Sequence, residues 1–426
     1  MKVLTIGGGG REMALVTHLV KCGHEVTAVG ASAAIAELAA ATLPMPSSKD
    51  PRAGWEELAI AAEQRGIELT IVGPEAPLAN GIADTFAARG LAIFAPTQAA
   101  AQLETSKAFA KAVMARAGVP TAAYQLFEDN AAAAEYLAAP DTPYPTVLKE
   151  NGLRAGKGVT ICASRAEAEA TLAVLELSAE NPLLIEEFLD GFEFSLIVAA
   201  NGTNYAPLPV AQDHKPIGEG NTGANTGGMG AVSPVPRVTP AIYQEAIERV
   251  IEPTLAQMVQ DGTPFTGFLY AGLIATANGV KVIEFNARLG DPEAEVILPR
   301  LEGDLATTAK TLLSGQSAEL PVTNRTCLGI VLSSPGYPGA VTAHPEIPAA
   351  LLAAVAAQPD AGFTHMGTAR AEAAASGWQA KGGRVAIVTM HGSDIADCRA
   401  KLLPLLEATL ADSDLYYRRD IGTFAG

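Results

Sequence analysis

Residues 2–20 read KVLTIGGGGREMALVTHLV, and this stretch decides the fold class. An apolar run over residues 2–6 meets four glycines, and apolar residues then recur with helical spacing from Met13 onward. That order predicts a strand, a tight loop and a helix. Further apolar strands at 25–29 and 69–72 alternate with helical segments. The N-terminal part is therefore predicted to be a doubly wound parallel sheet, with ligand-facing loops at the carboxyl ends of its strands.

The glycine loop does not match the fingerprint of a dinucleotide-binding site. In the pattern G-x-G-x-x-G the last glycine would fall on Glu12 or Met13, depending on whether the count starts at Gly7 or Gly8. The acid that would hold a ribose after the second strand is missing as well, since Val29-Gly-Ala stands there. A nicotinamide cofactor is therefore disfavoured. An anion at the helix N-terminus and a simple tight turn are both open readings.

Composition limits the class of protein. The 426 residues include 29 basic and 46 acidic side chains, and 49% of residues are hydrophobic. This length predicts two to four folded domains. The net charge of −17, without a basic patch, argues against nucleic acid and anionic membranes as partners. The first residues include too few apolar side chains for a signal peptide, and the apolar stretch at 349–357 is too short to span a membrane. The four cysteines are scattered singly, which argues against a disulfide framework. We therefore expect a cytoplasmic protein.

The rest of the chain alternates predicted helices, hairpins and one long loop. A helix is expected from Thr97 to Gly118, where a glycine followed by Val119-Pro120 ends it. The segment 212–233 is rich in glycine and is expected to be a long ordered loop of functional importance. The other expected elements are a lid made of a hairpin at 146–149 and 159–162, a helix at 165–177 and a strand at 183–188, and two hairpins at 194–199 with 205–210 and at 268–275 with 280–285.

The lid hairpin carries residues suited to a polyphosphate. Lys149 precedes the tip Gly152-Leu-Arg-Ala-Gly-Lys-Gly158, where glycines let the backbone close over phosphates and lysines supply charge. The order strand, loop, strand and the lack of Ser or Thr after Lys157 exclude a Walker A loop. The next strand, with Glu186, Glu187 and then Glu193, can offer backbone groups to an adenine and a carboxylate to ribose hydroxyls. A solvated turn and a solvent-facing acidic pair are the alternatives.

The stretch Val280-Lys-Val-Ile-Glu-Phe-Asn-Ala-Arg288 predicts a metal site. Alternate strand residues face one side, so Glu284, Asn286 and Arg288 project together. The first two offer oxygen ligands suited to Mg²⁺, and the guanidinium suits a phosphate or carboxylate. A structural ion pair between Glu284 and Arg288 would not call for an asparagine between them. The metal interpretation is therefore favoured.

This order of lysines, adenine strand and metal strand resembles the ATP-grasp superfamily and, within it, the phosphoribosylamine–glycine ligase family. The resemblance covers essentially the whole chain, and the run Asn225-Thr-Gly-Gly-Met-Gly-Ala231 is specific to this family. The other matching motifs are Gly73–Leu78, Pro96-Thr97, Leu103-Glu104, Ser106-Lys107, Leu153–Val159 apart from Arg154, Glu186–Leu189, Gln212-Asp-His-Lys215, Tyr270–Leu273, Glu284–Glu293 and Arg418–Gly422.

The resemblance implies an architecture and a reaction. The fold would be α/β, with an N-terminal pre-ATP-grasp domain at 1–101, a central ATP-grasp domain at 102–122 and 191–325, a small α+β lid at 123–190, and a small α/β C-terminal domain at 326–426. ATP, with Mg²⁺ or Mn²⁺, would bind between the lid and the central domain. The glycine carboxylate would take the γ-phosphoryl group, and the amine of 5-phosphoribosylamine would attack the acyl phosphate. We expect a monomer.

The same resemblance assigns residues to this reaction. The metal ligands are Glu284 and Asn286. Those expected to orient the reactants or stabilise charge are Arg288, Asp213, Lys157 and Glu293. The ATP-binding set is Lys107, Lys149, Gly156, Lys157, Gly158, Glu186, Glu187, Phe188, Leu189 and Glu193. The set for glycine and the sugar amine is Gly8, Gly9, Gly10, Arg11, Glu12, Pro74, Glu75, Asp213, Gly228, Met229, Gly230, Arg288, Gly290, Asp291 and Pro292.

Two departures from the family pattern fall on the pocket for the amine. Met13 stands where the family usually has histidine, and Val29–Ile35 offers Ser32 as its one hydroxyl in place of an Asn-Ala-Gly-Thr phosphate loop. The ATP and metal equipment is intact. Two alternatives follow: a related ATP-grasp carboxylate–amine ligase that uses a different amine, and a nucleotide-binding regulatory homologue.

Overall fold

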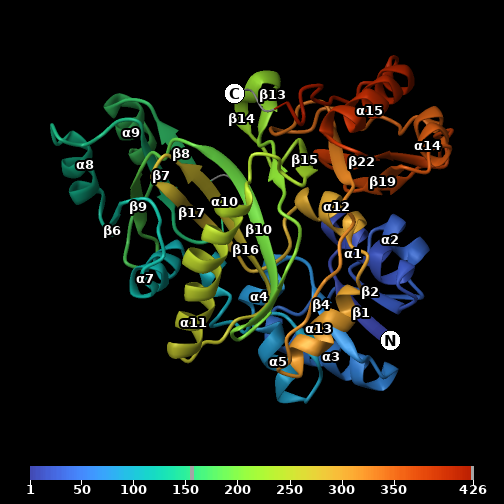
Figure 1. The fold of residues 1–426 in the computed structure, drawn as a ribbon, viewed down its shortest axis with the longest axis horizontal. Helices are drawn as coiled ribbons and strands as arrows, with labels where there is room; N and C mark the ends of the chain where they lie inside the picture. Colours follow the sequence, from blue (N-terminus) through green and yellow to red (C-terminus); the bar gives the residue numbers. More distant parts are fainter. Residues whose placement is uncertain (154–157, 424–426) are drawn as a thin grey trace.

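The structure is a computed structural model that describes residues 1–153 and 158–423. Its N-terminal part is a five-stranded parallel sheet in the order β3-β2-β1-β4-β5, with helices on both faces (Figure 1). The predicted doubly wound sheet is confirmed. Its strands are β1 (Lys2–Ile6), β2 (Glu25–Val29), β3 (Ala41–Leu43), β4 (Leu69–Val72) and β5 (Ile93–Phe94). Its helices are α1 (Gly10–Lys21), α2 (Ala33–Leu38), α3 (Pro51–Arg65), α4 (Glu75–Ala79) and α5 (Ile82–Ala88).

The central part is a four-stranded antiparallel sheet in the order β11-β10-β16-β17. Alternate residues of β10 enter two different cores: Phe194 and Leu196 lie in one, while Ile197 and Ala199 lie in the other. Both faces of this sheet are thus covered. The strands are β10 (Phe192–Asn201), β11 (Asn204–Pro207), β16 (Thr266–Thr276) and β17 (Gly279–Asn286). The helices are α6 (Gln102–Thr105), α7 (Lys107–Ala117), α10 (Pro240–Ala246), the π-helical turn Ile247–Ile251 and α11 (Glu252–Gln260).

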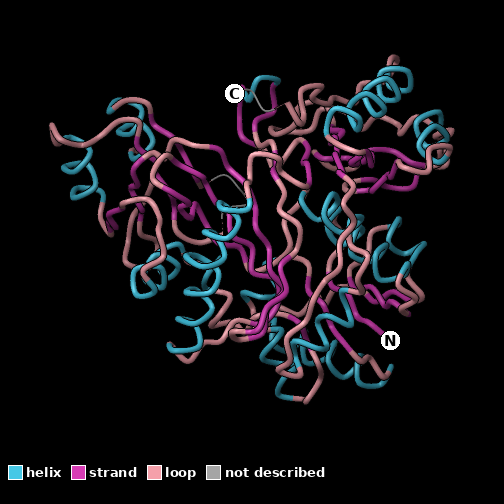
Figure 2. Tube along the Cα trace, in the orientation of Figure 1, coloured by secondary structure: helices cyan, strands magenta, loops and turns pink. Residues whose placement is uncertain are grey.

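The lid is a second antiparallel sheet, in the order β6-β9-β7-β8. Helices α8 (Asn130–Ala138) and α9 (Arg165–Leu172) lie on its outer side (Figure 2) and close a small core of their own over one face. The opposite face carries Lys149 and Glu186, since residues of one parity project to one side. The lid strands are β6 (Tyr124–Phe127), β7 (Thr146–Glu150), β8 (Val159–Cys162) and β9 (Leu183–Glu187).

The C-terminal part shares its sheet with an earlier segment of the chain. The strand order is β12-β15-β18-β22-β19, so two strands from 212–233 join strands that begin at residue 326 or later, and β15 pairs directly with β18. The sheet strands are β12 (Gln212–Asp213), β15 (Gly230–Ser233), β18 (Thr326–Ser333), β19 (Ala361–His365) and β22 (Arg384–Gly392). Two small pairs are β13 (Pro216–Gly218) with β14 (Thr222–Asn225), and β20 (Thr368–Arg370) with β21 (Trp378–Ala380). The helices of this part are α14 (Ala349–Ala356) and α15 (Ile395–Leu410), and α12 (Glu293–Ile297) packs on β15 and β18. Helix α13 (Leu305–Leu313) packs instead on β10 and β11 of the central sheet, and the 3₁₀ turns are Glu219–Asn221 and Leu298–Arg300.

Three sequence predictions need correction. The segment 212–233 is not one loop, because it forms four short strands. The helix expected from Thr97 begins at Gln102 and breaks at Ser106, whose extended backbone lets its hydroxyl cap α7 by accepting from the Phe109 N–H. The lid helix ends at Leu172 rather than at residue 177. The domain boundaries stay predictions.

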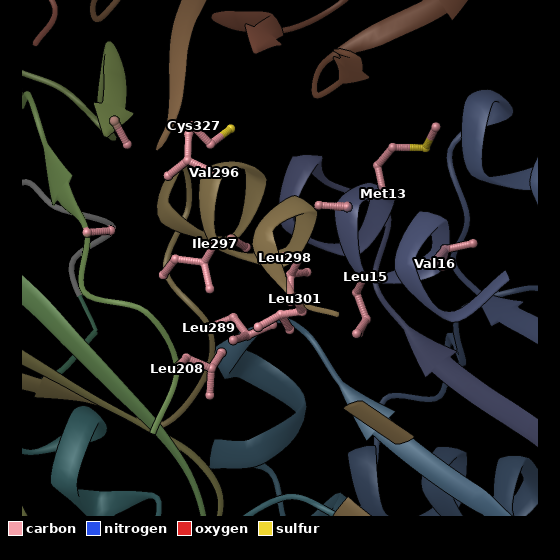
Figure 3. Packing of buried hydrophobic residues seen from close by; sticks show 14 of the residues in the cluster. Met13, Leu15, Val16, Leu208, Leu289, Val296, Ile297, Leu298, Leu301 and Cys327 are labelled. Carbon is pink, nitrogen blue, oxygen red and sulfur yellow. The ribbon is translucent and has the colours of Figure 1, made fainter. Parts of the chain in front are cut away.

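One large hydrophobic core joins the N-terminal and C-terminal parts. Figure 3 shows Leu15 of α1 in one cluster with Leu298, Leu301 and Cys327. Met13, one of the two family departures, is a buried member of this core. None of the helices in the described residues combines the length and apolar character that a membrane span requires.

His214 should make the stability of this fold sensitive to acid. It is 7% exposed, and its Nε2 accepts from the Gly422 N–H (3.2 Å), which ties the C-terminal tail to β12. Burial, with a smaller effect of Arg418, lowers the pKa of His214 to about 4. The unfolded chain therefore binds this proton first as the pH falls from 6.5. The stability that neutral His214 contributes is complete above that pH and is lost toward pH 4.

We expect His214 to account for about 3 kcal/mol of the loss in unfolding free energy over this window. The thermal midpoint of His214→Gln should depend less on pH than that of the unaltered protein between pH 6.5 and 4. The same substitution at the exposed His344 is the matched control. Equal pH slopes for the unaltered protein and His214→Gln would contradict this assignment.

Candidate active site

Two adjoining cavities lie between the lid and the central sheet. One is bounded by α6, α7, β7 and β17, and the other by β7, β8, β9, β16 and β17. They share Lys149, Val159, Glu186, Ile283 and Glu284. Lys149 Nζ donates to the Ile283 carbonyl at 3.0 Å, so the lid hairpin touches the strand that carries the predicted metal ligands. The structure thus brings together the three segments that the sequence singled out.

The described lysines of the predicted ATP site line the first of these cavities. Lys107, at the start of α7, donates to the Gly152 carbonyl of the hairpin tip at 3.1 Å. Lys149 and Gly158 contribute to the same wall. Gly156 and Lys157 lie outside the described residues.

Glu186 is held by two lysines. Its carboxylate lies 3.0 Å from Lys111 Nζ and 2.8 Å from Lys149 Nζ, and all three side chains are less than a tenth exposed. Burial lowers the pKa of Lys111, while Glu186 opposes that shift. Sequence reasoning missed Lys111, although it stands one helical turn after Lys107. In this structure the Glu186 carboxylate positions Lys149 and is not free to meet a ribose.

The second cavity combines apolar walls with acidic residues at its rim. Its apolar members include Val147, Ile161, Phe188, Leu189 and Ile274. Such walls suit a flat heterocyclic ring. Glu187 and Glu193 also line the cavity, paired with Lys281 (2.7 Å) and Lys215 (3.2 Å) respectively. The hydrogen bond from Lys281 lowers the pKa of Glu187.

Glu284 and Asn286 stand two residues apart on β17 and face the first cavity. Arg288 follows them and donates to Asn286 Oδ1 at 3.1 Å. Burial raises the pKa of Glu284, but the surrounding cations, chiefly Lys215 and Lys149, lower this pKa by a larger amount. The net shift of the Glu284 pKa is therefore downward. The carboxylate is therefore ionised and poised for a cation.

A divalent metal fits these two oxygen donors. Within the described ranges, no group of three or more His, Cys, Asp or Glu side chains is arranged to hold a metal ion. A cation at Glu284 and Asn286 would thus complete its shell with oxygens from a phosphate ligand and water. Magnesium sites beside nucleotides commonly have this sparse protein contribution.

Glu104 is a second residue that sequence reasoning left unassigned. Its carboxylate accepts from the Ala287 N–H (2.8 Å) and pairs with Arg288 (3.2 Å). Burial raises the pKa of Glu104, against the lowering effect of Arg288. The motif Leu103-Glu104 was the signal that could have identified it. Glu104 fixes the turn that ends the metal strand.

The N-terminal glycine loop is closed by Glu12. Its Oε2 accepts from the Gly9 N–H at 2.7 Å, and its Oε1 pairs with Arg11 Nε at 2.8 Å. A Cβ at Gly73 would overlap the Glu12 carboxylate, and a Cβ at Gly7 would come 2.9 Å from Pro74 Cδ. These glycines let the two loops meet.

Glu75 joins this loop to the metal strand. Its Oε2 lies 4.0 Å from Arg11 Nη2 and 3.9 Å from Arg288 Nε. Burial lowers the pKa of Arg11, but Glu12, Asp291 and Glu75 raise it more, so it stays charged. Ser32, the hydroxyl of the second family departure, caps α2 by accepting from the Ile35 N–H at 3.4 Å.

Asp213 and Glu293 form an acidic pair in different environments. Burial, reinforced by Glu293 and Glu193 and opposed by Lys215, raises the pKa of Asp213 to about 7. Glu293 Oε1 accepts from the hydroxyls of Ser195 and Tyr270, each at 2.9 Å. A carboxyl whose pKa lies near neutrality, as that of Asp213 does, is suited to exchanging a proton, and the two hydroxyls fix the position of Glu293.

The two remaining predicted loops pack on each other. Gly228 has φ +112°, and a Cβ there would overlap Pro292 Cδ. A Cβ on Gly290 would likewise overlap the Glu293 carboxylate, so this glycine too has no space for a side chain. Met229 is fully buried behind this contact, Gly230 follows it in β15, and Asp291 pairs with Arg384 at 2.9 Å. The predicted substrate loops therefore form one tightly packed wall.

Comparison with known families gives matches along almost the entire chain. The phosphoribosylglycinamide synthetase N domain matches residues 1–104, its ATP-grasp (A) domain 105–294, and its C domain 327–424.

Individual proteins support the same grouping. The chain is 39% identical to a phosphoribosylamine–glycine ligase of Lactococcus lactis, covering 100% of both chains, and 41% identical to one of Escherichia coli O6:H1, covering 99% and 98%. A crystal structure of a phosphoribosylamine–glycine ligase from Thermotoga maritima has a TM-score of 0.80 at 27% identity, covering 99% and 100% of the two chains. A biotin carboxylase domain from Hydrogenobacter thermophilus shares the fold alone, with a TM-score of 0.68 at 17% identity, covering 98% and 90%.

Removing Glu186 should destabilise the protein strongly, because it would leave Lys111 and Lys149 buried without their shared counter-charge. We expect Glu186→Ala to cost about 3 kcal/mol of unfolding free energy, measured from thermal or denaturant unfolding. Glu169→Ala is the matched control, since Glu169 pairs with Arg165 on the exposed side of α9. It should cost less than about 1 kcal/mol. Equal effects of the two substitutions would contradict a special role for the buried pair.

Proposed function

The chain belongs to the phosphoribosylglycinamide synthetase family, and on this premise we propose that it is an ATP-dependent ligase that joins glycine to 5-phosphoribosylamine. The products are glycinamide ribonucleotide, ADP and phosphate, a step of purine biosynthesis. The observation that carries the proposal is the shared wall of Lys149, Glu186 and Glu284 between the two cavities. We further propose that it acts as a monomer in the cytoplasm.

In the first step a glycine carboxylate oxygen attacks the γ-phosphorus of ATP. A new P–O bond forms, the bond to the β-phosphate oxygen breaks, and ADP leaves. Lys107 and Lys149, with Lys157 of the hairpin tip, stabilise the charge on the phosphoryl oxygens. Glu284 and Asn286 would hold Mg²⁺, or Mn²⁺ on the same oxygen donors, and the metal would neutralise phosphate charge when bound. Arg288, anchored by Glu104, orients the glycine carboxylate.

The second step transfers the glycyl group to the amine. The amine nitrogen attacks the acyl carbon, a C–N bond forms, the C–O bond to phosphate breaks, and the nitrogen gives up a proton. Glu293, fixed by Ser195 and Tyr270, accepts a hydrogen bond from the attacking amine. Asp213, with its pKa near 7, exchanges a proton with the attacking amine at neutral pH. The loops at 8–12, 74–75 and 290–292 hold the sugar amine.

The adenine end of ATP is proposed to occupy the second cavity. The apolar side chains Val147, Ile161 and Leu189 cover its ring, and the backbone around Glu187 and Phe188 meets its edge. Glu193 accepts from the ribose hydroxyls. Glu186 contributes through Lys149.

A different amine substrate is the second candidate, and one observation favours it. Met13 is buried in the core and has no donor for a sugar phosphate. The Ser32 oxygen accepts from the Ile35 N–H, and its O–H can still donate, so this hydroxyl is the one side-chain donor that the altered loop keeps. A regulatory homologue without turnover is less favoured, because the lysines and the metal strand are intact.

The proposed reaction requires both substrates. With protein, ATP, Mg²⁺ and glycine present, ADP should accumulate only after freshly prepared 5-phosphoribosylamine is added, because the acyl phosphate turns over by amine attack. Coupled measurement of ADP and of the amide product checks this. ADP formation that responds equally to other amines would point to the second candidate, and tight ATP binding without turnover would point to the regulatory one.

Replacing Glu284 should abolish turnover through loss of a metal ligand. We expect Glu284→Ala to lower kcat by at least about 100-fold at saturating ATP, because the charge on the transferred phosphoryl group loses its counter-ion. Turnover is measured against the Mg²⁺ concentration, with ATP affinity measured in parallel. Glu319→Ala, at an exposed site, is the control and should behave as the unaltered protein. An unchanged Mg²⁺ dependence in Glu284→Ala would remove this residue from the metal site.

A further inference from the structure

The C-terminal domain grips the two loops that form the substrate wall. Arg384, the first residue of β22, donates through Nη1 to the Gly227 carbonyl (2.6 Å) and the Asp291 carbonyl (3.0 Å), and it pairs with Asp291 Oδ1 (2.9 Å). The Gly227 N–H in turn donates to the Tyr337 hydroxyl at 3.0 Å. Both polar groups of Gly227 are thus bound by side chains of the C-terminal domain.

The glycines around these hydrogen bonds are packed so closely that they leave no space for side chains. A Cβ on Gly227 would come 2.9 Å from the Arg384 guanidinium carbon, and a Cβ on Gly383 would overlap the Tyr337 ring. Gly228, next in the chain, presses on Pro292 in the same way. Gly383, directly before Arg384, and the turn that carries Tyr337 therefore serve one contact.

The Arg384 guanidinium carries its positive charge at a mostly buried position. Burial lowers the pKa of Arg384, but Asp291, Tyr337, Glu295 and Glu293 raise it more. Glu295 is 1% exposed, and neither of its carboxylate oxygens has a hydrogen-bond partner in another described residue. Arg384 is thus a permanent cation facing several buried acids, and its loss would disturb more than one of them.

The two gripped loops lead directly to the two halves of the acidic pair. Glu293 follows Pro292 directly and begins α12. On the other loop, the turn at Gly227 and Gly228 leads into β15, where Ala231 pairs with Asp213. Arg384 lines neither cavity between the lid and the central sheet. Its influence should therefore fall on the reaction of the amine and not on ATP.

We propose that Arg384 and Tyr337 are positioning residues for the second step: the C-terminal domain clamps the Gly227–Gly228 turn onto Asp291–Pro292 and so sets the spacing of Asp213 and Glu293 around the attacking amine. This inference rests on the proposed function. It gives the C-terminal domain a part in the chemistry without contact to ATP. Loss of the clamp lets the acyl phosphate form but leaves the amine poorly oriented.

The test separates the two steps in Arg384→Lys and Tyr337→Phe. Arg384→Lys keeps the charge, but its side chain is one atom shorter, so the ammonium cannot occupy the position from which Nη1 meets three oxygens. Tyr337→Phe removes only the hydroxyl. The first readout is glycine-dependent positional exchange of the β,γ-bridging oxygen of ATP, without amine. The second is amide formation with 5-phosphoribosylamine, together with the ratio of ADP to amide. Arg325→Lys is the matched control, because Arg325 forms an exposed ion pair with Asp360 in the same domain.

We expect oxygen exchange within about threefold of the unaltered protein in both variants, an amine KM raised by about tenfold or more, and more than one ADP per amide. Parallel loss of both readouts would overturn the inference, since it would indicate a merely structural role, and so would an unchanged amine KM. Absence of glycine-dependent exchange in the unaltered protein would instead overturn the proposed function, and the inference with it.

Discussion

The arrangement of the site depends on one buried ionic group, the carboxylate of Glu186 between Lys111 and Lys149. It joins three separate elements: helix α7, the lid strand β9 and the lid strand β7. Because Lys149 also donates to the Ile283 carbonyl, the same group fixes the lid against the strand that bears Glu284 and Asn286. A buried carboxylate needs such partners, since an uncompensated charge is costly away from water. The nucleotide side of the site is thus defined by the requirement to neutralise this one group.

The substrate side is organised by close backbone contact instead. Because Gly73 and Gly7 have no side chain, Glu12 packs directly against them, and Pro292 packs against Gly228 in the same way. The contacts of Gly73 with Glu12 and of Gly228 with Pro292 join segments that are far apart in the chain, whereas Gly7 and Glu12 lie close together in it, and none of these contacts leaves space for a Cβ. Arg288, which follows β17, links this strand to the packed wall through its ion pairs with Glu75 and Glu104. The two halves of the site therefore meet at the end of β17.

Local patterns predicted a large part of this structure. The strand at residues 2–6, the helix after Gly10 and the alternation of Glu284 with Asn286 follow from periodicity and turn chemistry, which act over a few residues. Strand β15 was missed, since its hydrogen bonds depend on a partner, β18, that is distant in the chain. The break at Ser106 follows from a local serine cap that the sequence reasoning overlooked. Lys111 and Glu104 also escaped, because a buried charge is identified by the partner that tertiary structure brings to it. Arg384 belongs to the same class: its contacts lie 157 and 93 residues away.

The shared sheet of the C-terminal part has a consequence for the modularity of this chain. Strands β12 and β15 come from residues before 234, and they pair with each other, yet β15 also hydrogen-bonds to β18. A gene fusion or chimera with its junction near residue 326 would take β18 away from β15 and expose an unpaired edge. Exchange of the last hundred residues between relatives is thus constrained by the sequence at 212–233. The two segments should be inherited together, as a single unit of recombination.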